Sequence, residues 1–173
     1  MLRVAGCVAD SIVDGPGLRF TVFFQGCPHH CPGCHNPETW AFEGGQECTP
    51  EELVALAKRS PLCKGITLSG GEPFAQAGDE MLEFVRLCRA AGFEVAAYTG
   101  YTFEQLFAME DPDVQKLLGL LDILVDGRFV EAERSLSLRF RGSRNQRIID
   151  LPQSLAAGRA IECTAERWTG ETT

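Results

Sequence analysis

Three cysteines in one short segment are the residues of this chain with the clearest capacity for chemistry. Cys27, Cys31 and Cys34 lie in the run Phe24-Gln-Gly-Cys-Pro-His-His-Cys-Pro-Gly-Cys-His35. Thiolates this close together can bind three irons of a 4Fe-4S cluster and leave the fourth iron open, whereas clusters that only transfer electrons usually have four cysteine ligands. The spacing therefore predicts one 4Fe-4S cluster whose open iron can bind a substrate.

A zinc site is the alternative interpretation of these cysteines, with His29, His30 or His35 as the fourth ligand. Zinc sites of this kind usually combine two separated pairs of ligands, and the sequence has no second pair with that spacing. A histidine ligand would also close the position that the chemistry requires, which favours the cluster. The five other cysteines are expected to have no ligand role: Cys88 fits the apolar pattern of a helix, and the isolated ones are Cys7, Cys48, Cys63 and Cys163.

A second motif, Ile66-Thr-Leu-Ser-Gly-Gly-Glu-Pro73, is an apolar run that ends in two glycines and an acid. Alone it would be only a weak turn signal. At the end of a strand, however, Gly70 and Gly71 would let backbone groups approach a small ligand closely. The carboxylate of Glu72 could accept a hydrogen bond from an ammonium group. The motif therefore predicts a binding edge for a ligand that carries an amino group.

Strand-like and helix-like segments alternate along the chain, which is the pattern of a mostly parallel α/β sheet. Ligands bind such sheets at the carboxyl ends of the strands, where the cysteines, the glycine pair, Thr99 and the Asp126–Arg128 segment fall. The length and strand number are too small for a closed eight-fold barrel, so a single-domain open or partial (β/α) barrel is expected. Strands are expected near residues 3–8, 18–25, 65–68, 93–98, 121–125 and 147–151, and helices near 49–59, 79–91, from 102 and over 114–118.

The overall composition limits the class of protein. The 173 residues are expected to form one domain, 1–173, with its core over about 3–151 and a flexible tail over about 164–173. The net charge of -8 argues against nucleic acid as a partner. Residues 1–10 do not show the apolar stretch typical of a signal peptide, and no apolar run in the sequence is long enough to span a membrane. A cytoplasmic protein is therefore expected.

One segment reverses the charge of the whole. Residues 128–147 contain two glutamates and six arginines, namely Arg128, Arg134, Arg139, Arg141, Arg144 and Arg147. A solvated surface is one explanation. The other is a site for a carboxylate, a phosphate or an acidic partner.

The motifs together resemble those of the radical S-adenosylmethionine (SAM) superfamily. The segments Asp14–Arg19, Cys27–Trp40 and Gly70–Pro73 are similar to those of glycyl-radical-enzyme activases. Within that group, Tyr98–Tyr101, 125–129 and 140–147 are similar to the activases of the anaerobic (class III) ribonucleoside-triphosphate reductase. The pair His35-Asn36 is more like the pyruvate formate-lyase branch. The resemblance covers about residues 3–151.

This resemblance implies an oxidoreductase whose chemistry belongs to its cofactors, one 4Fe-4S cluster and SAM, rather than to a catalytic side chain. Reductive cleavage of SAM would give a 5′-deoxyadenosyl radical, which would remove hydrogen from a glycine of the partner. The implied partners are the anaerobic reductase and a flavodoxin- or ferredoxin-type electron donor. The alternatives are an activase of another glycyl radical enzyme, of the pyruvate formate-lyase type, and a zinc or iron–sulfur binding protein without turnover.

The resemblance also implies roles for particular residues. Cys27, Cys31 and Cys34 would bind the cluster, and the glycine at position 33 excludes the adenine stacking that an aromatic provides there in many relatives. The implied SAM contacts are Gly33, Cys34 and His35 beside the ligand, Gly70, Gly71 and Glu72 at its methionine end, and Thr99, Asp126 and Arg128 at the later strand ends.

Overall fold

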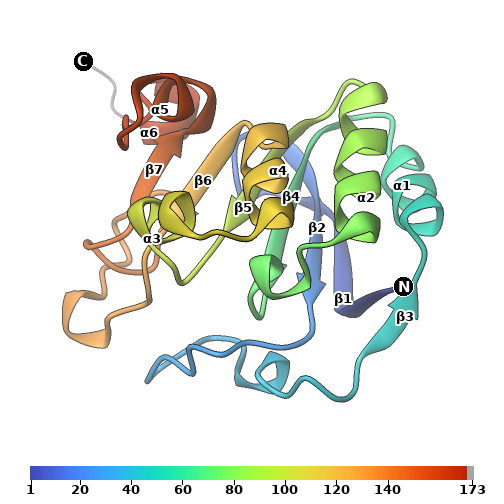
Figure 1. Ribbon diagram of the computed structural model, residues 1–173, viewed down its shortest axis with the longest axis horizontal. Helices are drawn as coiled ribbons and strands as arrows, with labels where there is room; N and C mark the ends of the chain where they lie inside the picture. Colours follow the sequence, from blue (N-terminus) through green and yellow to red (C-terminus); the bar gives the residue numbers. More distant parts are fainter. Residues whose placement is uncertain (171–173) are drawn as a thin grey trace.

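A seven-stranded sheet with the order β3-β1-β2-β4-β5-β6-β7 forms the framework of the structure, a computed structural model that describes residues 1–170 (Figure 1). Its two edge strands, β3 and β7, are not paired with each other, so the sheet is not closed and the predicted open or partial (β/α) barrel is confirmed. The strands are β1 (Leu2–Ser11), β2 (Leu18–Phe24), β3 (Gln46–Cys48), β4 (Cys63–Gly70), β5 (Glu94–Tyr98), β6 (Ile123–Asp126) and β7 (Arg147–Asp150).

The helices mostly lie between strands that pair in parallel. β2, β4, β5 and β6 are parallel neighbours, whereas β1, β3 and β7 pair antiparallel. The helices are α1 (Pro50–Lys58), α2 (Asp79–Ala90), α3 (Phe103–Ala108), α4 (Pro112–Leu120), α5 (Leu151–Ala157) and α6 (Glu166–Thr169), with the short 3₁₀ helices η1 (Pro37–Thr39), η2 (Pro73–Gln76) and η3 (Glu131–Glu133). No helix among residues 1–170 is long and apolar enough to cross a membrane.

The helix starts follow from local chemistry in the sequence. The hydroxyl of Thr49 accepts a hydrogen bond from the Glu52 N–H and caps α1, and Pro50 occupies the first helical position. Thr102 and Gln105 form the reciprocal capping box that opens α3. Both predicted helix starts are therefore confirmed.

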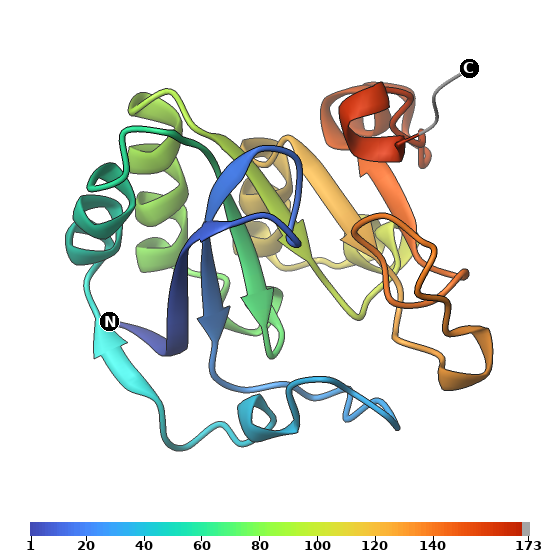
Figure 2. The ribbon, with the colours of Figure 1, turned by 180° about the vertical axis from the view of Figure 1, so that it is seen from behind.

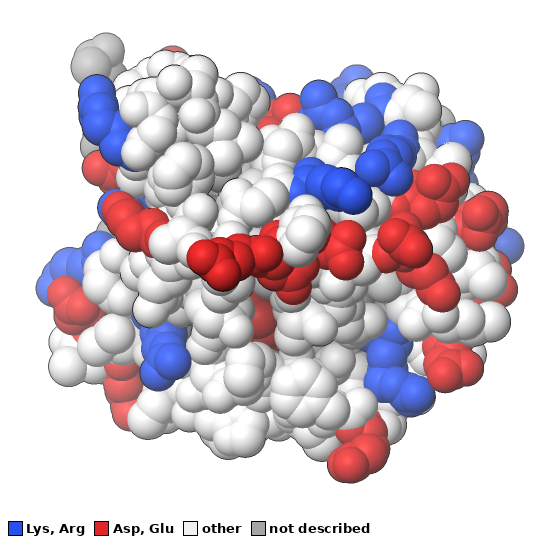
Figure 3. All heavy atoms as spheres, viewed as in Figure 1, with Lys and Arg blue, Asp and Glu red and all other residues white. Residues whose placement is uncertain are grey.

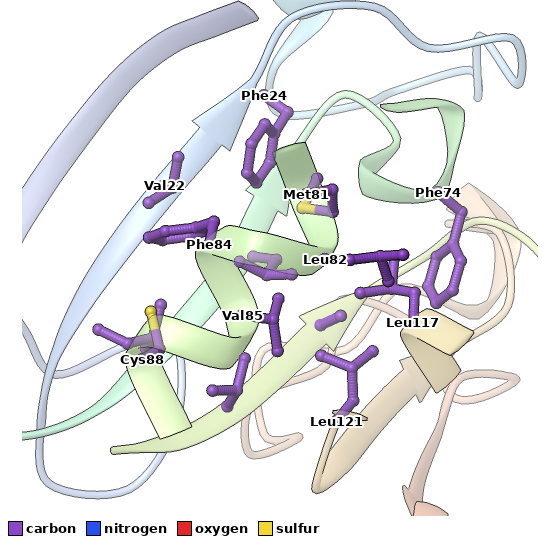
Figure 4. Close-up of a cluster of buried hydrophobic side chains, with 14 of the residues drawn as sticks. Val22, Phe24, Phe74, Met81, Leu82, Phe84, Val85, Cys88, Leu117 and Leu121 are labelled. Carbon is purple, nitrogen blue, oxygen red and sulfur yellow. The ribbon is translucent and has the colours of Figure 1, made fainter. Parts of the chain in front are cut away.

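The main core lies between the sheet and the helices α1, α2 and α4, which cover one of its faces (Figures 1 and 2). Figure 4 shows side chains of α2 directed at the sheet, with Phe84 beside Val22 of β2. Phe84 and Cys88 are fully buried, and the prediction that Cys88 packs as an apolar residue is confirmed. This packing fixes the strands whose ends carry the candidate site.

The opposite face of the sheet has its own apolar cluster, which includes Val125 and Trp168. Successive strand residues face opposite sides, so Val125 belongs to this cluster while Leu124 belongs to the main core. Trp168 comes from α6 and is completely buried. The described part of the expected tail is therefore packed against the sheet, and the core extends past residue 151. Residues 171–173 lie outside the described residues.

Trp168 packs beside a buried arginine at the amino ends of the parallel strands. The guanidinium of Arg19 lies 5.3 Å from the centre of the Trp168 ring and donates hydrogen bonds to the Thr67 hydroxyl and the Ile66 carbonyl. Arg19 also forms an ion pair of 3.0 Å with Glu94. The motif Asp14–Arg19, which the sequence analysis singled out only by its resemblance to activases, thus contains a structural arginine.

The ion pairs of Glu94 make stability depend on pH. Burial alone would raise the pKa of Glu94, but Arg167 and Arg19 together hold it below the ordinary glutamate value. A lowered folded-state pKa adds stability above the ordinary glutamate pKa, and this contribution is lost as the pH falls through the folded-state pKa. We therefore expect Glu94→Gln to reduce the free energy of unfolding at pH 7 and to reduce it less at about pH 3. Urea unfolding at both pH values measures this; an equal loss at both would contradict it.

Candidate functional site

A cavity of about 740 Å³ opens at the carboxyl ends of the parallel strands. The cysteine loop, residues 26–36, follows β2 and crosses this end of the sheet (Figures 1 and 2). The cavity therefore lies where strand topology places ligand sites. Of the residues expected from sequence, it is lined by Cys27, Cys31, Cys34, His35, Gly70, Gly71 and Thr99.

The cysteine loop is held by backbone hydrogen bonds to the segment around η1. The amide of Gly26 donates to the Thr39 carbonyl at 2.7 Å, and the amide of Cys27 donates to the Trp40 carbonyl at 3.1 Å. The side chain of Gln25 donates to the carbonyls of Glu38 and Ala41. These contacts fold the loop back on itself, so that all three cysteines reach the cavity.

The three thiols are free, and backbone N–H groups lie beside the sulfur atoms of two of them. Burial raises the pKa of the Cys27 thiol, and the backbone amides of His29 and His30 oppose this by facing its sulfur. Cys34 likewise accepts a hydrogen bond at 3.4 Å from the Asn36 amide. Within residues 1–170, no three His, Cys, Asp or Glu side chains converge closely enough for a single metal ion. The thiols are spread around the cavity wall rather than gathered at one point.

Trp40 supplies a further polar group at this wall. Its ring stacks on His30, with centroids 4.8 Å apart, and also lines the cavity. The indole N–H is buried and has no hydrogen-bond acceptor in the described part of the chain. A buried donor without an acceptor is unusual. Three free thiols and this donor together fit an iron–sulfur group, whose sulfur atoms accept hydrogen bonds.

The glycine pair lets the end of β4 approach the cysteine loop. A Cβ atom on Gly70 would lie 2.4 Å from the Phe24 amide nitrogen, and Gly70 has a φ of +90°. A Cβ atom on Gly71 would lie 2.3 Å from the Gly26 carbonyl oxygen. Both distances are far too short for a real contact. In the structure the missing side chains admit neighbouring backbone, that of β2 at Gly70 and that of the cysteine loop at Gly71.

Glu72 lies beneath the cavity rather than in its wall. Its side chain is completely buried, and the Oε1 atom accepts hydrogen bonds from His29, Thr99 and Gly100. The Oε2 atom accepts a bond of 3.0 Å from the Phe74 amide and so caps η2. The structure thus brings Glu72 to the other candidate residues, but its carboxylate faces protein groups.

Asp126 and Arg128 line a second cavity of about 540 Å³ beside the first. The two cavities share Gly100 and Gly127. Asp126 is buried, and its carboxylate accepts hydrogen bonds from the Phe103 amide and the Arg147 guanidinium. Bonds to Asp126 and Glu104 raise the pKa of Arg147 above its ordinary value. Asp126 therefore belongs to an ion-pair network adjoining the main cavity.

Gly33 is placed apart from the other expected contacts. It has a φ of +77°, and a Cβ atom there would lie 3.1 Å from Cδ of Glu131. Gly33 is not among the residues that line the main cavity. Its conformation, rather than space for a ligand, is what the structure requires of this glycine.

Several cavity residues belong to segments that were singled out in the sequence but were not themselves predicted as site residues. Tyr98 and Phe140 lie on the face of the sheet opposite the main core, with the apolar cluster of Trp168, and both line the cavity. There the Tyr98 hydroxyl donates a hydrogen bond to the Phe140 carbonyl at 2.6 Å. Asp14 accepts hydrogen bonds from Ser11 and Thr21 and also reaches the cavity. Strand alternation could have indicated Tyr98. Phe140 begins the segment 140–147 that resembles the activases, but it lies in an irregular loop, so periodicity could not indicate that it lines the cavity.

The loop between β6 and β7 forms the basic side of the cavity mouth. Arg134, Arg141 and the exposed Leu136 of this loop line the cavity. Figure 3 shows acidic side chains in a band across the helical face, whereas the lower part of the view, where Figure 1 places the cysteine loop, is largely uncharged. The charge reversal found in the sequence therefore lies at the site.

The fold and the site define an α/β protein with a cysteine-lined cavity. In the sequence, residues 13–149 match the family model of the 4Fe-4S single cluster domain. The anaerobic ribonucleoside-triphosphate reductase-activating protein of Escherichia coli (strain K12) is 39% identical over 142 residues, 78% of this chain and 90% of that protein. Its counterpart in Vibrio cholerae is 36% identical over 78% of this chain and 89% of that protein. The chain therefore belongs to the family of anaerobic ribonucleoside-triphosphate reductase-activating proteins.

A second group of relatives is longer. The pyruvate formate-lyase-activating enzyme of Clostridium pasteurianum is 39% identical over 132 residues, 71% of this chain but 52% of that protein. The chain thus spans about half the length of that relative. Among solved structures, QueE from Escherichia coli aligns with a TM-score of 0.47 and 18% identity, over 58% of this chain and 53% of that one.

Proposed function

We propose that this protein uses SAM and one 4Fe-4S cluster to generate a glycyl radical on an anaerobic ribonucleoside-triphosphate reductase. The observation that carries the proposal is the meeting of three free thiols with Gly70 and Gly71 in one cavity. The names of the relatives support the choice of partner. A pyruvate formate-lyase is the second candidate partner, because the match to its activating enzyme has similar identity.

The protein's own residues bind and orient the reactants. Cys27, Cys31 and Cys34 would bind the cluster, which together with SAM supplies reductive cleavage of the sulfur–C5′ bond. The proposed SAM site takes in the cavity residues Cys34, His35, Gly70, Gly71 and Thr99, with Gly33 next to the last cysteine. Glu72 contributes from beneath, and Asp126 and Arg128 from the adjoining cavity.

The remaining partners follow from the same activity. The proposal includes a flavodoxin- or ferredoxin-type electron donor and a cytoplasmic location, where such donors and the reductase would be found. It includes neither nucleic acid nor a membrane surface, and the net charge of -8 supports the exclusion of nucleic acid.

Anaerobic reconstitution tests the function directly. We expect the reduced protein to convert SAM to 5′-deoxyadenosine and methionine, measured by chromatography. After mixing with the reductase, electron paramagnetic resonance should show a glycyl radical on the reductase. Pyruvate formate-lyase mixed in the same way should give little or none. Failure to cleave SAM would contradict the enzyme assignment, and a radical on the lyase alone would contradict the choice of partner.

Arg144 separates docking from SAM cleavage. It is exposed and does not line the main cavity, although its loop forms the cavity mouth. We expect Arg144→Glu to slow glycyl-radical formation about tenfold at low salt, because charges at an interface rim mainly affect association. SAM cleavage without the reductase should be unchanged.

The control is Arg59→Glu, which makes the same charge change at the exposed end of α1, away from the cavity (Figure 1). It should leave both rates unchanged. The effect of Arg144→Glu should also shrink at high salt, because salt screens exposed charges. Equal losses of SAM cleavage and radical formation in Arg144→Glu would contradict a docking role.

A further inference from the structure

We propose that Glu72 is a positioning residue that ties the cysteine loop to the ends of β4 and β5, with His29 as its partner. This role rests on the proposed function, because it concerns how Glu72 acts at the proposed SAM site. The sequence suggests that this carboxylate holds the amino group of the ligand. In the structure it holds protein groups, and it would act on the ligand through them.

The hydrogen bonds of Glu72 leave little capacity for a ligand. Oε1 accepts from the Thr99 hydroxyl at 2.7 Å, the Gly100 amide at 2.8 Å and Nε2 of His29 at 2.7 Å. Oε2 accepts from the Phe74 amide. Two carboxylate oxygens offer about four acceptor positions in all. The three donors on Oε1 fill that oxygen, and the one position left, on Oε2, belongs to a side chain that is completely buried.

His29 brings the cysteine loop to this carboxylate. It stands between Cys27 and Cys31, and its side chain is only 3% exposed. Because an ionised carboxylate can only accept, Nε2 of His29 carries the proton in this bond. A fixed ring therefore holds this part of the loop, between two proposed cluster ligands, against the end of the sheet.

The lack of a side chain at Gly100 independently supports this position of the His29 imidazole ring. A Cβ atom on Gly100 would lie 2.3 Å from Cδ2 of His29. Tyr101 packs edge-on against the other side of the imidazole, with ring centroids 4.5 Å apart. The residues after β5 thus leave a space that His29 fills. The loop and the strand end are therefore fitted to each other through this ring.

Three substitutions in the cysteine loop test the hydrogen bond between His29 and Glu72. In the full-length protein before cluster reconstitution, we expect His29→Ala to speed amide hydrogen exchange across residues 27–35 by roughly tenfold or more, because a charge-assisted hydrogen bond is lost. His29→Gln should restore most of the protection, since its amide can donate in place of Nε2. The control is His30→Gln, the same change at the next residue, whose ring stacks on Trp40 instead; it should exchange like the original protein.

Affinity for SAM distinguishes positioning from direct contact. In the reconstituted protein, loss of such an outer partner should weaken SAM binding by roughly tenfold to a hundredfold. His29→Ala and Glu72→Gln should give similar losses, and the double variant should be no worse than the poorer single one. Equilibrium dialysis with labelled SAM measures all three, and thermal unfolding identifies any variant that has not folded.

Gly100→Ala tests the same geometry without removing a hydrogen-bonding group. It should displace the ring of His29 and reproduce the faster exchange of the loop.

Two results would overturn the inference. One is a Glu72→Gln protein that loses SAM affinity while His29→Ala binds SAM and exchanges like the original, which would make Glu72 a direct contact. The other is unchanged loop exchange in both His29→Ala and Gly100→Ala. Failure of the original protein to bind a cluster or SAM would instead contradict the proposed function, because the exchange experiment does not depend on either.

Discussion

Changing any one of Cys27, Cys31 and Cys34 to alanine is expected to abolish the 4Fe-4S cluster. The three thiols are free and reach the same cavity from one loop, and each would hold a different iron. Loss of one leaves two ligands and a second exposed iron. Iron and sulfide content after anaerobic reconstitution, with the visible absorption spectrum, measures the effect. SAM cleavage should disappear with the cluster.

Two other cysteines serve as controls. Cys48→Ala at the edge strand β3 and Cys163→Ala beside β7 should leave the iron content unchanged, because both lie outside the cavity lining. Cluster retention in a Cys27, Cys31 or Cys34 variant would contradict the assignment. So would stoichiometric zinc without iron in the original protein under strictly anaerobic conditions.

Trp168→Ala is expected to lower the free energy of unfolding by about 3 to 5 kcal/mol, the usual cost of removing a large buried aromatic side chain. Trp168 is completely buried and packs on both Arg19 and Phe140. The substitution would also remove the indole ring that packs over the buried guanidinium of Arg19. Urea unfolding at neutral pH measures the loss.

Leu136→Ala is the matched control for Trp168→Ala, because Leu136 is 89% exposed. Substitutions at such exposed positions usually change stability by about 0.5 kcal/mol or less. Trp168→Phe should fall between the two, since it keeps most of the packing. If Trp168→Ala were as stable as the original protein, the last described helix would contribute nothing to the core.

The sequence predicted the central elements because each carried its own local signal. Thr49 and Thr102 marked helix starts by their side-chain chemistry, and the buried runs of β2 and β4 marked strands. Other elements had no such signal. β3 has three residues, and its existence depends on pairing with β1. Trp168 is a single aromatic in a four-residue helix, so periodicity could not show its burial.

The candidate site was predictable to the level of strand ends. That rule correctly brought the cysteines, the glycine pair and Thr99 to one cavity. The rule could not give side-chain direction. All four residues of β6 are buried, so alternation of polar and apolar residues could not show that Asp126 would face the second cavity. The pattern also could not show that the Glu72 side chain would lie beneath the main cavity, because this position depends on contacts with residues distant in sequence.

The direction of β7 separates the two ends of this molecule. Because β7 is antiparallel to β6, the chain leaves it at the end of the sheet opposite the cavity and continues into α5 and α6 (Figure 1). A segment joined after α6 therefore starts away from the cysteine loop but beside Arg139 of the loop between β6 and β7. A small purification tag at that point would leave the cysteine loop free, whereas a bulky fused domain there, or an insertion in the loop between β6 and β7, would crowd the mouth of the cavity.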